Sequence, residues 1–250
     1  MDPSWDSLMG SGRKAHGLMT FANDALPCEL CFEQRGDCET TAAPDDGTYS
    51  RLWPTAVVLS RYLCAHPDLV RGKRVVELGA GSGAVGLVCA ALGAEYVCLT
   101  DVPSALHLLE ANAARNAAAS SSSRVGVAPC TWGDAAHIEA LLAKGGAFDV
   151  VVACEVVYKQ DEEVLQALAA TQDALLSREG DGALVLFAYE FRCNMVEDWP
   201  YFAAAEELFD VELVQLREYE AGLAQPGTPE DDCSRTLYRY SRRRPAPEPP

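Results

Sequence analysis

Apolar and polar positions along the chain form two kinds of segment that follow each other in regular order. Short apolar runs rich in Val, Leu and Tyr predict strands at 73–78, 94–101, 124–132, 148–158, 182–190, 209–219 and 234–241. Segments with apolar residues at helical spacing predict helices at 53–66, 82–93, 103–116, 134–146, 162–177 and 199–208. Each of the first five strands is therefore followed by a helix.

This order predicts the fold class. Strands that alternate with helices form a mostly parallel sheet that is covered on both faces. The last two strands follow each other without a helix, so we expect a C-terminal hairpin that adds an antiparallel strand. The chain is therefore predicted to form a single doubly wound α/β domain around a seven-stranded sheet.

The ends of the chain differ in composition from its middle. Residues 1–50 form a predicted N-terminal arm, in which 1–25 are weakly patterned and loose. Within this arm, PCELCFEQ (27–34) alternates and predicts a strand, and a turn-rich linker follows it. The predicted domain covers 51–241, and the remaining segment RRRPAPEPP (242–250) is typical of a disordered tail.

Charge and composition narrow the class of protein. Asp and Glu number 37 against 20 Lys and Arg, and the net charge of −17 argues against a nucleic-acid partner. No apolar run approaches the roughly 20 residues of a membrane span, and the polar N-terminus has no secretory signal. We therefore expect a cytoplasmic monomer that could also enter the nucleus, with its ten scattered cysteines reduced.

One pair of cysteines has the spacing of a metal site. Cys28 and Cys31 form a CxxC, with Cys38 and His16 nearby in the sequence. Residues three apart in a strand point to opposite faces, so these two thiols would not reach one ion. The chain also lacks a second CxxC or HxxxH half, so we expect no metal.

The turn after the strand at 73–78 has the clearest ligand signal. VVELGAGSG places Gly79, Gly81 and Gly83 before a helix, where glycine lets backbone amides approach a ligand closely. A tight turn alone would also explain these glycines, and the segment satisfies the dinucleotide form G-x-G-x-x-A. The glycines therefore leave a nicotinamide cofactor and S-adenosylmethionine both open.

Two acidic residues bear on this choice. Glu77 precedes the turn, and a carboxylate that faces the ligand suits a cationic aminoacyl group better than a pyrophosphate. The alternative is that Glu77 caps neighbouring backbone amides. Asp101 ends the next strand, where we expect an exposed carboxylate that accepts hydrogen bonds from a ribose, as both cofactor classes require.

Several further segments occur in a characteristic order: LWPTAVVLSRYL, VVELGAGSGAVGL, LTDVP with Asn112 and Asn116, CTWGD, FDVVVACEVVY and AYEFR. Over about residues 50–240 the chain thereby resembles class I methyltransferases, in particular the protein-lysine methyltransferases of methyltransferase family 16. The segment VELGAG is shared by most class I methyltransferases. The tryptophan before the first predicted helix, the TWG after the third strand and the acidic-x-x-Tyr after the fourth are together more specific for family 16. AYEFR with a late hairpin is most similar to the member that acts on the valosin-containing chaperone ATPase, followed by the member that acts on elongation factor 1A.

The resemblance implies a Rossmann-like fold, S-adenosylmethionine as cofactor, and roles for individual residues. Asp101 would hold the ribose, Trp132 would pack on the adenine, and Cys154 would line the pocket. With Glu77 added from the argument above, the predicted cofactor-binding residues are Trp53, Glu77, Gly79, Ala80, Gly81, Asp101, Trp132 and Cys154. Each has a structural alternative, because the tryptophans could fill the core and Cys154 is a buried strand residue either way.

The segment Glu155-Val156-Val157-Tyr158 is the implied acceptor site. Glu155 and Tyr158 would orient the lysine nitrogen, although many relatives have Asp at position 155 and also at position 54, where this chain has Pro54. The predicted function is methyl transfer to a lysine of a protein substrate, with a chaperone ATPase or a translation elongation factor as candidates. The alternatives are a small-molecule or other methyl acceptor, an NAD-dependent oxidoreductase, and a catalytically silent binding module.

Overall fold

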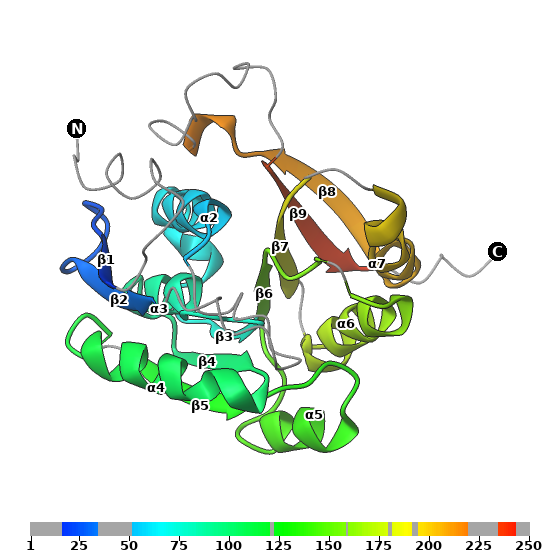
Figure 1. Ribbon diagram of the computed structural model, residues 1–250, viewed down its shortest axis with the longest axis horizontal. Coiled ribbons are helices and arrows are strands. Elements are labelled where there is room, and N and C mark those ends of the chain that lie inside the picture. The colour runs from blue at the N-terminus through cyan, green and yellow to red at the C-terminus, as the bar shows by residue number, and fades with distance from the viewer. Residues whose placement is uncertain are drawn as a thin grey trace.

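Seven strands form one sheet at the centre of the molecule, and helices cover both of its faces (Figure 1). The computed structural model describes residues 17–34, 52–120, 123–158, 160–179, 182–191, 195–219 and 235–243. The strands of the sheet are β3 (Arg74–Leu78), β4 (Tyr96–Asp101), β5 (Arg124–Pro129), β6 (Val150–Cys154), β7 (Leu184–Glu190), β8 (Phe209–Gln215) and β9 (Arg235–Arg242). The helices are α2 (Pro54–Ala65), α3 (Ala84–Ala91), α4 (Leu106–Arg115), α5 (Ala135–Leu142), α6 (Glu162–Leu175) and α7 (Met195–Leu208), with 3₁₀ turns η2 (Pro67–Leu69), η3 (Pro103–Ala105) and η4 (Arg217–Tyr219).

The strands lie in the order β5-β4-β3-β6-β7-β9-β8. The first five in this order are parallel, whereas β9 is antiparallel to both of its neighbours, β7 and β8. From β3 the chain adds β4 and then β5 on one side, and it then crosses back to add β6 on the other side of β3. The predicted doubly wound sheet with its antiparallel C-terminal hairpin is thereby confirmed. In such sheets, ligands bind at the carboxyl ends of the strands where the order reverses, which here is between β3 and β6.

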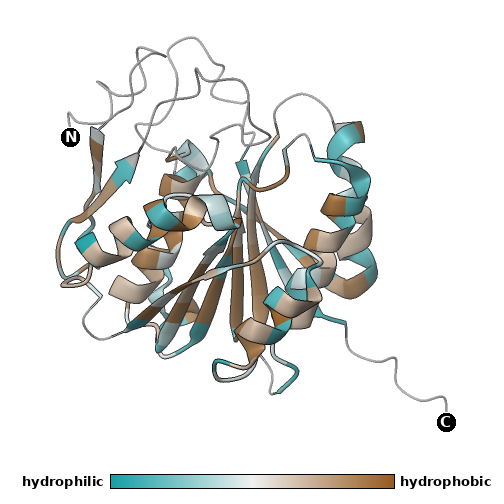
Figure 2. Ribbon diagram, turned by 60° about the horizontal axis from the view of Figure 1, so that its bottom comes forward, coloured by the Kyte–Doolittle hydropathy of each residue, from teal (hydrophilic) through white to brown (hydrophobic). Residues whose placement is uncertain are grey.

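Apolar side chains of the strands pack against a helix layer on each face. Val75 and Val150 belong to the core shared with α2 and α3, and Val76 and Val151 to the core shared with α6 and α7. Figure 2 shows the apolar colour concentrated on the central strands and the polar colour on outward parts of the helices. Because both faces are covered, the strands appear in the sequence as nearly continuous apolar runs.

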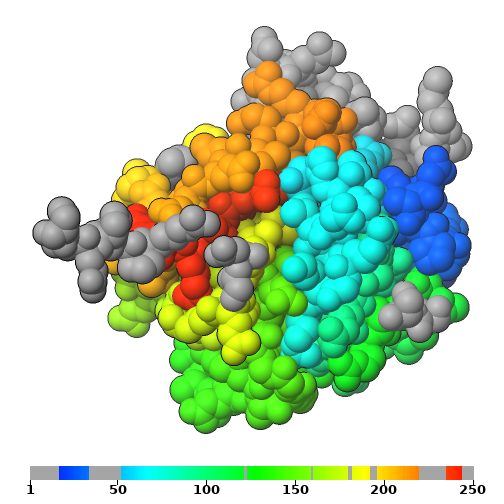
Figure 3. Space-filling model, turned by 180° about the vertical axis from the view of Figure 1, so that it is seen from behind, coloured from blue at the N-terminus to red at the C-terminus, as the bar shows by residue number. Residues whose placement is uncertain are grey.

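The segment after β8 folds back onto α2. Arg61 Nη1 donates a hydrogen bond to the Tyr219 carbonyl (3.0 Å), and the rings of Tyr62 and Tyr219 meet edge to face. In the view from behind, α2 (cyan) lies directly beside the orange residues of β8 and η4 (Figure 3). The helix that begins after Trp53 is therefore held by the C-terminal part of the chain as well as by the sheet.

A separate two-stranded hairpin, β1 (Gly17–Phe21) and β2 (Leu30–Gln34), lies at the other side of the molecule (Figure 1). The sequence predicted the second strand, but its assignment of 17–25 to a loose arm is wrong for β1. Met19 and Phe21 are buried while Leu18 is exposed, which is the alternation of a strand with one face on the core. Five residues are too few for this alternation to stand out in the sequence without knowledge of the partner strand.

Several predicted boundaries also differ from the structure. β5 ends at Pro129 and not at 132, and β8 ends at Gln215 and not at 219. β6 ends at Cys154 and not at 158, because the next residue turns the chain out of the sheet. α7 begins at Met195, four residues before the predicted start. β9 continues to Arg242, whose guanidinium pairs with Asp173 and donates to the Leu176 carbonyl (2.8 Å), so the predicted tail begins too early. The predicted linker and residues 244–250 lie outside the described residues.

Two features of the chain bear on metal and membrane binding, the CxxC pair and the apolar helices. Cys28 lies exposed in the loop before β2, and Cys31 lies within that strand. Among the residues that the structure describes, no three His, Cys, Asp or Glu side chains gather as metal ligands would. None of the described helices is long and apolar enough to cross a membrane.

Candidate active site

The loops that follow β3, β4, β5 and β6 meet at one edge of the sheet, because the four strands are parallel neighbours. The turn Gly79–Gly81 follows β3, Asp101 ends β4, Trp132 follows β5, and Cys154 ends β6. This edge contains the reversal of strand order between β3 and β6. The fold therefore gathers these predicted residues at the position where doubly wound sheets bind ligands.

The glycine turn has the conformation that its sequence predicted. Gly79, Gly81 and Gly83 have φ values of 63°, 54° and 77°, in the left-handed region that side chains other than glycine rarely adopt. A Cβ atom on Gly79 would lie 2.6 Å from Val156 Cγ1 and 3.4 Å from Trp132 Cζ2. The turn is therefore in direct contact with the segments that follow β5 and β6, and it has no room for a side chain at Gly79.

Asp101 holds this turn in place. Its Oδ2 accepts a hydrogen bond from the Gly81 amide (2.7 Å), and its Oδ1 accepts one from the Val102 amide (2.7 Å). The side chain is buried, with an exposed fraction of 8%, which corrects the expectation of an exposed carboxylate. A carboxylate offers about four lone-pair sites, more than these two amides use, so the predicted ribose contact is chemically compatible with this arrangement.

The Glu77 side chain points towards α3 and not towards the site where a ligand would bind. Its exposed fraction is 2%, and its Oε2 accepts a hydrogen bond from the Gly86 amide in α3 (2.8 Å). Burial raises the pKa of Glu77 to about 8, and the nearby charge of Asp101 also raises it. The carboxyl is then mostly protonated at pH 7. It therefore lacks most of the negative charge that was predicted to attract a cationic group. This geometry supports the capping alternative, and a direct cofactor contact of Glu77 stays a prediction.

The remaining predicted cofactor residues differ in how the structure relates them to the turn, and Cys154 among them is half-buried at the end of β6. Trp132 is half-buried and packs against the core of the α6 side, beside Gly79. Ala80 is buried and donates its amide to the Thr100 carbonyl (2.9 Å). Trp53 precedes α2, where its carbonyl accepts the Ala56 amide (3.0 Å). The structure brings Trp132 to the turn, whereas the contact between Trp53 and the cofactor stays a prediction.

The predicted acceptor segment begins with an unusual backbone conformation. Glu155 has a φ of 58°, and it is the one residue other than glycine with a positive φ in the described chain. Its amide donates to the Ala188 carbonyl (2.9 Å), which fixes this residue between the ends of β6 and β7. Such strain costs about 1–3 kcal/mol and is often retained at functional sites, where the surrounding structure enforces it.

Two residues that support this segment escaped the sequence analysis. Gln160 accepts a hydrogen bond from the Tyr158 amide and donates one to the Val156 carbonyl (3.0 Å), so it braces the turn of the predicted acceptor residues. Tyr189 lies at the end of β7, and its hydroxyl donates to Asp198 in α7. No local spacing in the sequence identifies Gln160, whereas Tyr189 stands inside the AYEFR motif.

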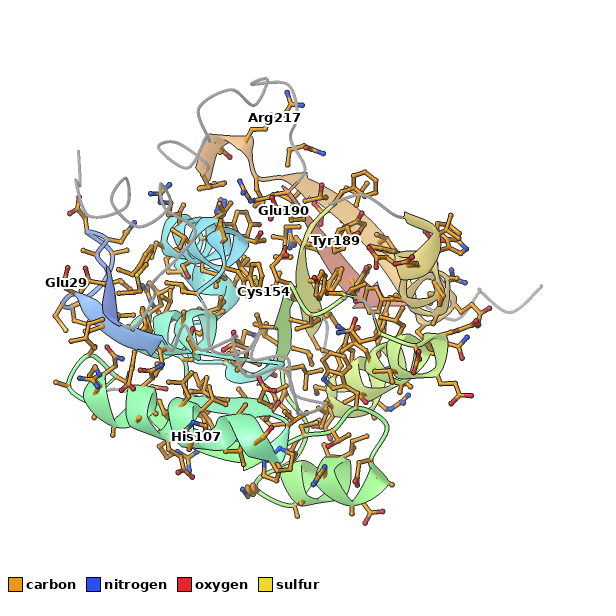
Figure 4. All side chains as sticks on the ribbon, in the orientation of Figure 1. Glu29, His107, Cys154, Tyr189, Glu190 and Arg217 are labelled. Carbon is orange, nitrogen blue, oxygen red and sulfur yellow. The ribbon has the colours of Figure 1, made fainter. Side chains whose placement is uncertain are left out.

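Tyr189 connects the acceptor segment to α7. Burial raises the pKa of Tyr189 above its ordinary range, and the negative charges of Asp198 and Glu155 raise it further. The Glu155 carboxylate is therefore close enough to Tyr189 to act on it electrostatically. Figure 4 shows Cys154 and Tyr189 on neighbouring strands, with Glu190 directed to the other face of β7.

Comparison with known proteins identifies the family of this chain. Residues 40–207 match the model of a family described as lysine methyltransferase. This chain belongs to that lysine methyltransferase family. The membership confirms the resemblance found in the sequence and, with it, S-adenosylmethionine as the predicted cofactor.

Individual relatives match this chain over part of its length. The zebrafish (Danio rerio) protein N-lysine methyltransferase METTL21A is 39% identical over 140 residues, which are 56% of this chain and 60% of the relative. The protein N-terminal and lysine N-methyltransferase EFM7 of Yarrowia lipolytica is 29% identical over 194 residues, 68% of this chain and 70% of the relative. The match spans 60% and 55% of the zebrafish and mouse METTL21A proteins, which is less than two thirds of their length.

A solved structure shows the same fold. The T. thermophilus 16S rRNA methyltransferase RsmC, in complex with AdoMet and guanosine, superposes with a TM-score of 0.57 at 18% identity. The superposition covers 90% of this chain and 51% of RsmC. At this identity the likeness establishes the class I methyltransferase fold, whereas the acceptor has to be argued from the site.

Proposed function

We propose that this protein transfers a methyl group from S-adenosylmethionine to a lysine side chain of a protein substrate. The observation that supports this most directly is the juxtaposition of Glu155 with the glycine turn. Val156, the residue after Glu155, lies against Gly79, so a group held by Glu155 and a cofactor held by the turn would be neighbours. Glu155 and the glycine turn both lie at the reversal of strand order.

The residues of the turn fit this cofactor. The turn admits no side chain at Gly79, the Asp101 carboxylate can accept hydrogen bonds from a diol, and the indole of Trp132 offers a flat apolar face. When bound, S-adenosylmethionine would supply a methyl group on a positively charged sulfur. A neutral amine would bond to the methyl carbon as the C–S bond breaks, a neutral thioether would leave, and the methylated nitrogen would release one proton to solvent. Gly79, Ala80, Gly81, Asp101 and Trp132 are the residues that would hold it.

The acceptor segment must deliver a neutral lysine. An ordinary lysine has a pKa of about 10.4, so its neutral form costs roughly 4.6 kcal/mol at pH 7. Val156 and Val157 are buried beside the site, and apolar surroundings lower the pKa of an incoming lysine. Glu155 attracts the ammonium group, and Glu155 and Tyr158 then orient the nitrogen, so that most of the rate comes from positioning.

The candidates for the substrate come from the relatives. One is named as a METTL21A protein N-lysine methyltransferase, one as EEF1A lysine methyltransferase 3 of the mouse, and EFM7 is named for protein N-termini as well as lysine. A translation elongation factor is therefore the first substrate to test. The chaperone ATPase, which only the resemblance in the sequence suggests, is the second. The monomeric state and the cytoplasmic location stay predictions.

Labelling of a cell extract tests this proposal. The extract is incubated with isotope-labelled S-adenosylmethionine and either the wild-type protein or Glu155→Gln, and the labelled position is mapped by mass spectrometry. We expect label on a lysine Nε of a protein with the wild type, and at least about a hundredfold less with the variant. Label on an N-terminal amine, in the small-molecule or nucleic-acid fraction, or nowhere, would overturn the lysine assignment.

A further inference from the structure

Three large apolar side chains are exposed within nine residues at the end of β7 and the start of α7. The exposed fractions are 44% for Phe191, 81% for Val196 and 50% for Trp199, and we call these three residues the α7 patch. Val196 and Trp199 are three apart in a helix and therefore neighbours on one of its faces. Single exposed apolar residues need no explanation, whereas several together indicate an interaction site.

The α7 patch is attached to the acceptor segment. Asp198, which precedes Trp199, accepts the hydrogen bond from Tyr189. The residue before Tyr189, Ala188, accepts the hydrogen bond from the Glu155 amide (2.9 Å). The first turn of α7 is thus connected to Glu155 through the bond between Asp198 and Tyr189, the peptide unit between Tyr189 and Ala188, and the bond between Ala188 and Glu155. A protein that contacts the α7 patch would be close to the acceptor carboxylate.

Acidic side chains accompany the α7 patch. Asp161, Glu162 and Glu163 are exposed at the start of α6, and Glu197 is exposed at the start of α7. Acids in the first turn of a helix also stabilise its dipole, and these acids serve that role. However, α6 and α7 pack on each other and both begin after neighbouring parallel strands, so the two groups of acids share one edge of the sheet. The whole chain is acidic as well, with a net charge of −17.

We propose that the α7 patch is the docking surface for the substrate protein, and that it selects a segment with apolar and Lys or Arg residues around the methylated lysine. This proposal rests on the proposed function. Trp199 is its expected anchor, because tryptophan is enriched among the residues that dominate binding energy at interfaces. The acids would attract a basic segment over a distance and raise its rate of association.

Two synthetic peptides with one central lysine test the docking surface. The first has Leu and Arg flanks, the second has Ser and Glu flanks of the same length, and binding is measured by fluorescence anisotropy at low and high salt. We expect the basic apolar peptide to bind at least about tenfold more tightly at low salt, and less tightly at high salt. Trp199→Ala should weaken this binding by at least about tenfold and leave S-adenosylmethionine affinity unchanged.

The matched control is Leu18→Ser, which removes an equally exposed apolar side chain (56%) from β1 on the other side of the molecule. It should leave peptide binding unchanged. Equal binding of both peptides, or equal effects of Trp199→Ala and Leu18→Ser, would overturn the docking proposal even if the extract is methylated. Peptide binding without any methyl transfer would instead contradict the proposed function, so the two failures are distinguishable.

A second inference comes from two asparagines of α4 and the segment after it. Asn112 Oδ1 accepts the Glu33 amide (2.7 Å), and its Nδ2 donates to the Glu33 carbonyl (3.1 Å). Asn116 does the same with the amide and carbonyl of Cys31, at 2.8 Å each. Both side chains are buried. The two carboxamides therefore bind the edge of β2 as the peptide groups of a neighbouring strand would.

Asn116 Nδ2 also donates to the Asn112 carbonyl (2.8 Å). Asn112 has a different further bond. Its Nδ2 also donates to the carbonyl of Ser82 (2.9 Å), which lies in the glycine turn between Gly81 and Gly83. The same buried amide thus joins the N-terminal hairpin to the turn at the candidate active site. We infer that Asn112 is a positioning residue, through which the hairpin fixes the conformation of the glycine turn and hence the affinity for the cofactor.

Asn112→Leu and Asn116→Leu form a matched pair of variants for this inference. Each removes one buried carboxamide from β2, whereas Asn112→Leu alone removes the bond to the turn. We expect both to lower the melting temperature, and Asn112→Leu to raise the KM for S-adenosylmethionine about tenfold with little change in kcat. Asn116→Leu should change this KM by less than about twofold.

Equal KM values for the two variants would overturn the inference, because a merely structural role would affect both alike. Should Asn112→Leu fail to fold, Asn112→Asp provides the same test. It retains an oxygen that accepts the Glu33 amide and loses the donor to the carbonyls of Ser82 and Glu33. A wild-type KM in Asn112→Asp would then contradict the positioning role.

Discussion

The two halves of the site are built in different ways. The cofactor half consists of the glycine turn, Asp101 and Trp132, and its polar groups are buried and bonded to backbone amides. The acceptor half consists of Glu155, Tyr158, Tyr189 and the α7 patch, where a strained residue adjoins exposed apolar and acidic side chains. The first half is fixed before any ligand arrives, whereas the second can vary between enzymes that share a cofactor. Substitutions in each half test this division, from the largest expected effect to the smallest.

Gly79→Val should abolish cofactor binding. Valine would have to adopt a φ near 63° and would place its Cβ 2.6 Å from Val156 Cγ1, so the turn would have to open. Calorimetry should then detect no binding of S-adenosylmethionine. The matched control is Gly72→Ala, which also has a positive φ (68°) but nothing within 4 Å of the added Cβ, and which should lose stability while it retains affinity. Binding by Gly79→Val at wild-type affinity would remove the turn from the cofactor half.

Glu155→Gln should separate the two halves. Glutamine retains the shape and one acceptor oxygen but loses the charge that attracts a lysine ammonium. Methyl transfer should fall by at least about a hundredfold, while cofactor affinity stays within a few-fold. Glu139→Gln, an exposed substitution on α5, serves as the control and should leave both unchanged. If Glu155→Gln lowers both the melting temperature and the cofactor affinity, Glu155 is a structural carboxylate.

Asp101→Ala should weaken cofactor binding and stability together. The variant leaves the amides of Gly81 and Val102 without their acceptor, which costs about 1–3 kcal/mol of unfolding free energy. The loss of a charge-assisted bond to the ribose should reduce affinity by about 10- to 100-fold. Asp149→Ala removes a comparable bond, from the Arg74 amide (2.8 Å), at the opposite edge of the sheet, and should lower stability alone. Identical cofactor affinities of the two variants would remove the ribose assignment.

Glu77→Gln should change the pH dependence of stability and have the smallest effect on cofactor binding. Because burial raises the pKa of Glu77 from 4.5 to about 8, the folded state retains a proton that the unfolded chain loses between these pH values. The contribution of Glu77 to stability is therefore complete below pH 4.5 and declines as the pH rises towards 8. Glutamine can still accept the Gly86 amide and does not titrate. Urea unfolding at pH 5, 6.5 and 8 should show a flatter profile for the variant, and parallel profiles would contradict the raised pKa.

The sheet and the glycine turn could be predicted from the sequence, because both have local signals. Strands covered on both faces appear as unbroken apolar runs, and the left-handed backbone of the turn requires glycine at Gly79, Gly81 and Gly83. The end of β6 was placed too late, since Glu155 continues an apolar run whose backbone nevertheless leaves the sheet.

Features that depend on contacts between distant segments could not be predicted. β2 is held by Asn112 and Asn116, which follow it by about eighty residues and bind backbone groups that every sequence possesses, and β1 is held by its pairing with β2. The bond between Glu77 and the Gly86 amide likewise depends on how α3 packs on β3. A carboxylate beside a glycine turn looks the same in the sequence whether it faces a ligand or a helix.

The affinity for S-adenosylmethionine, measured by calorimetry across Gly79→Val, Asp101→Ala, Glu155→Gln and Trp199→Ala, tests the division between the two halves most directly. The account predicts that affinity is lost in Gly79→Val, reduced about 10- to 100-fold in Asp101→Ala, and retained in Glu155→Gln and Trp199→Ala. Similar affinities in all four variants, or a loss in Glu155→Gln as large as in Asp101→Ala, would contradict it.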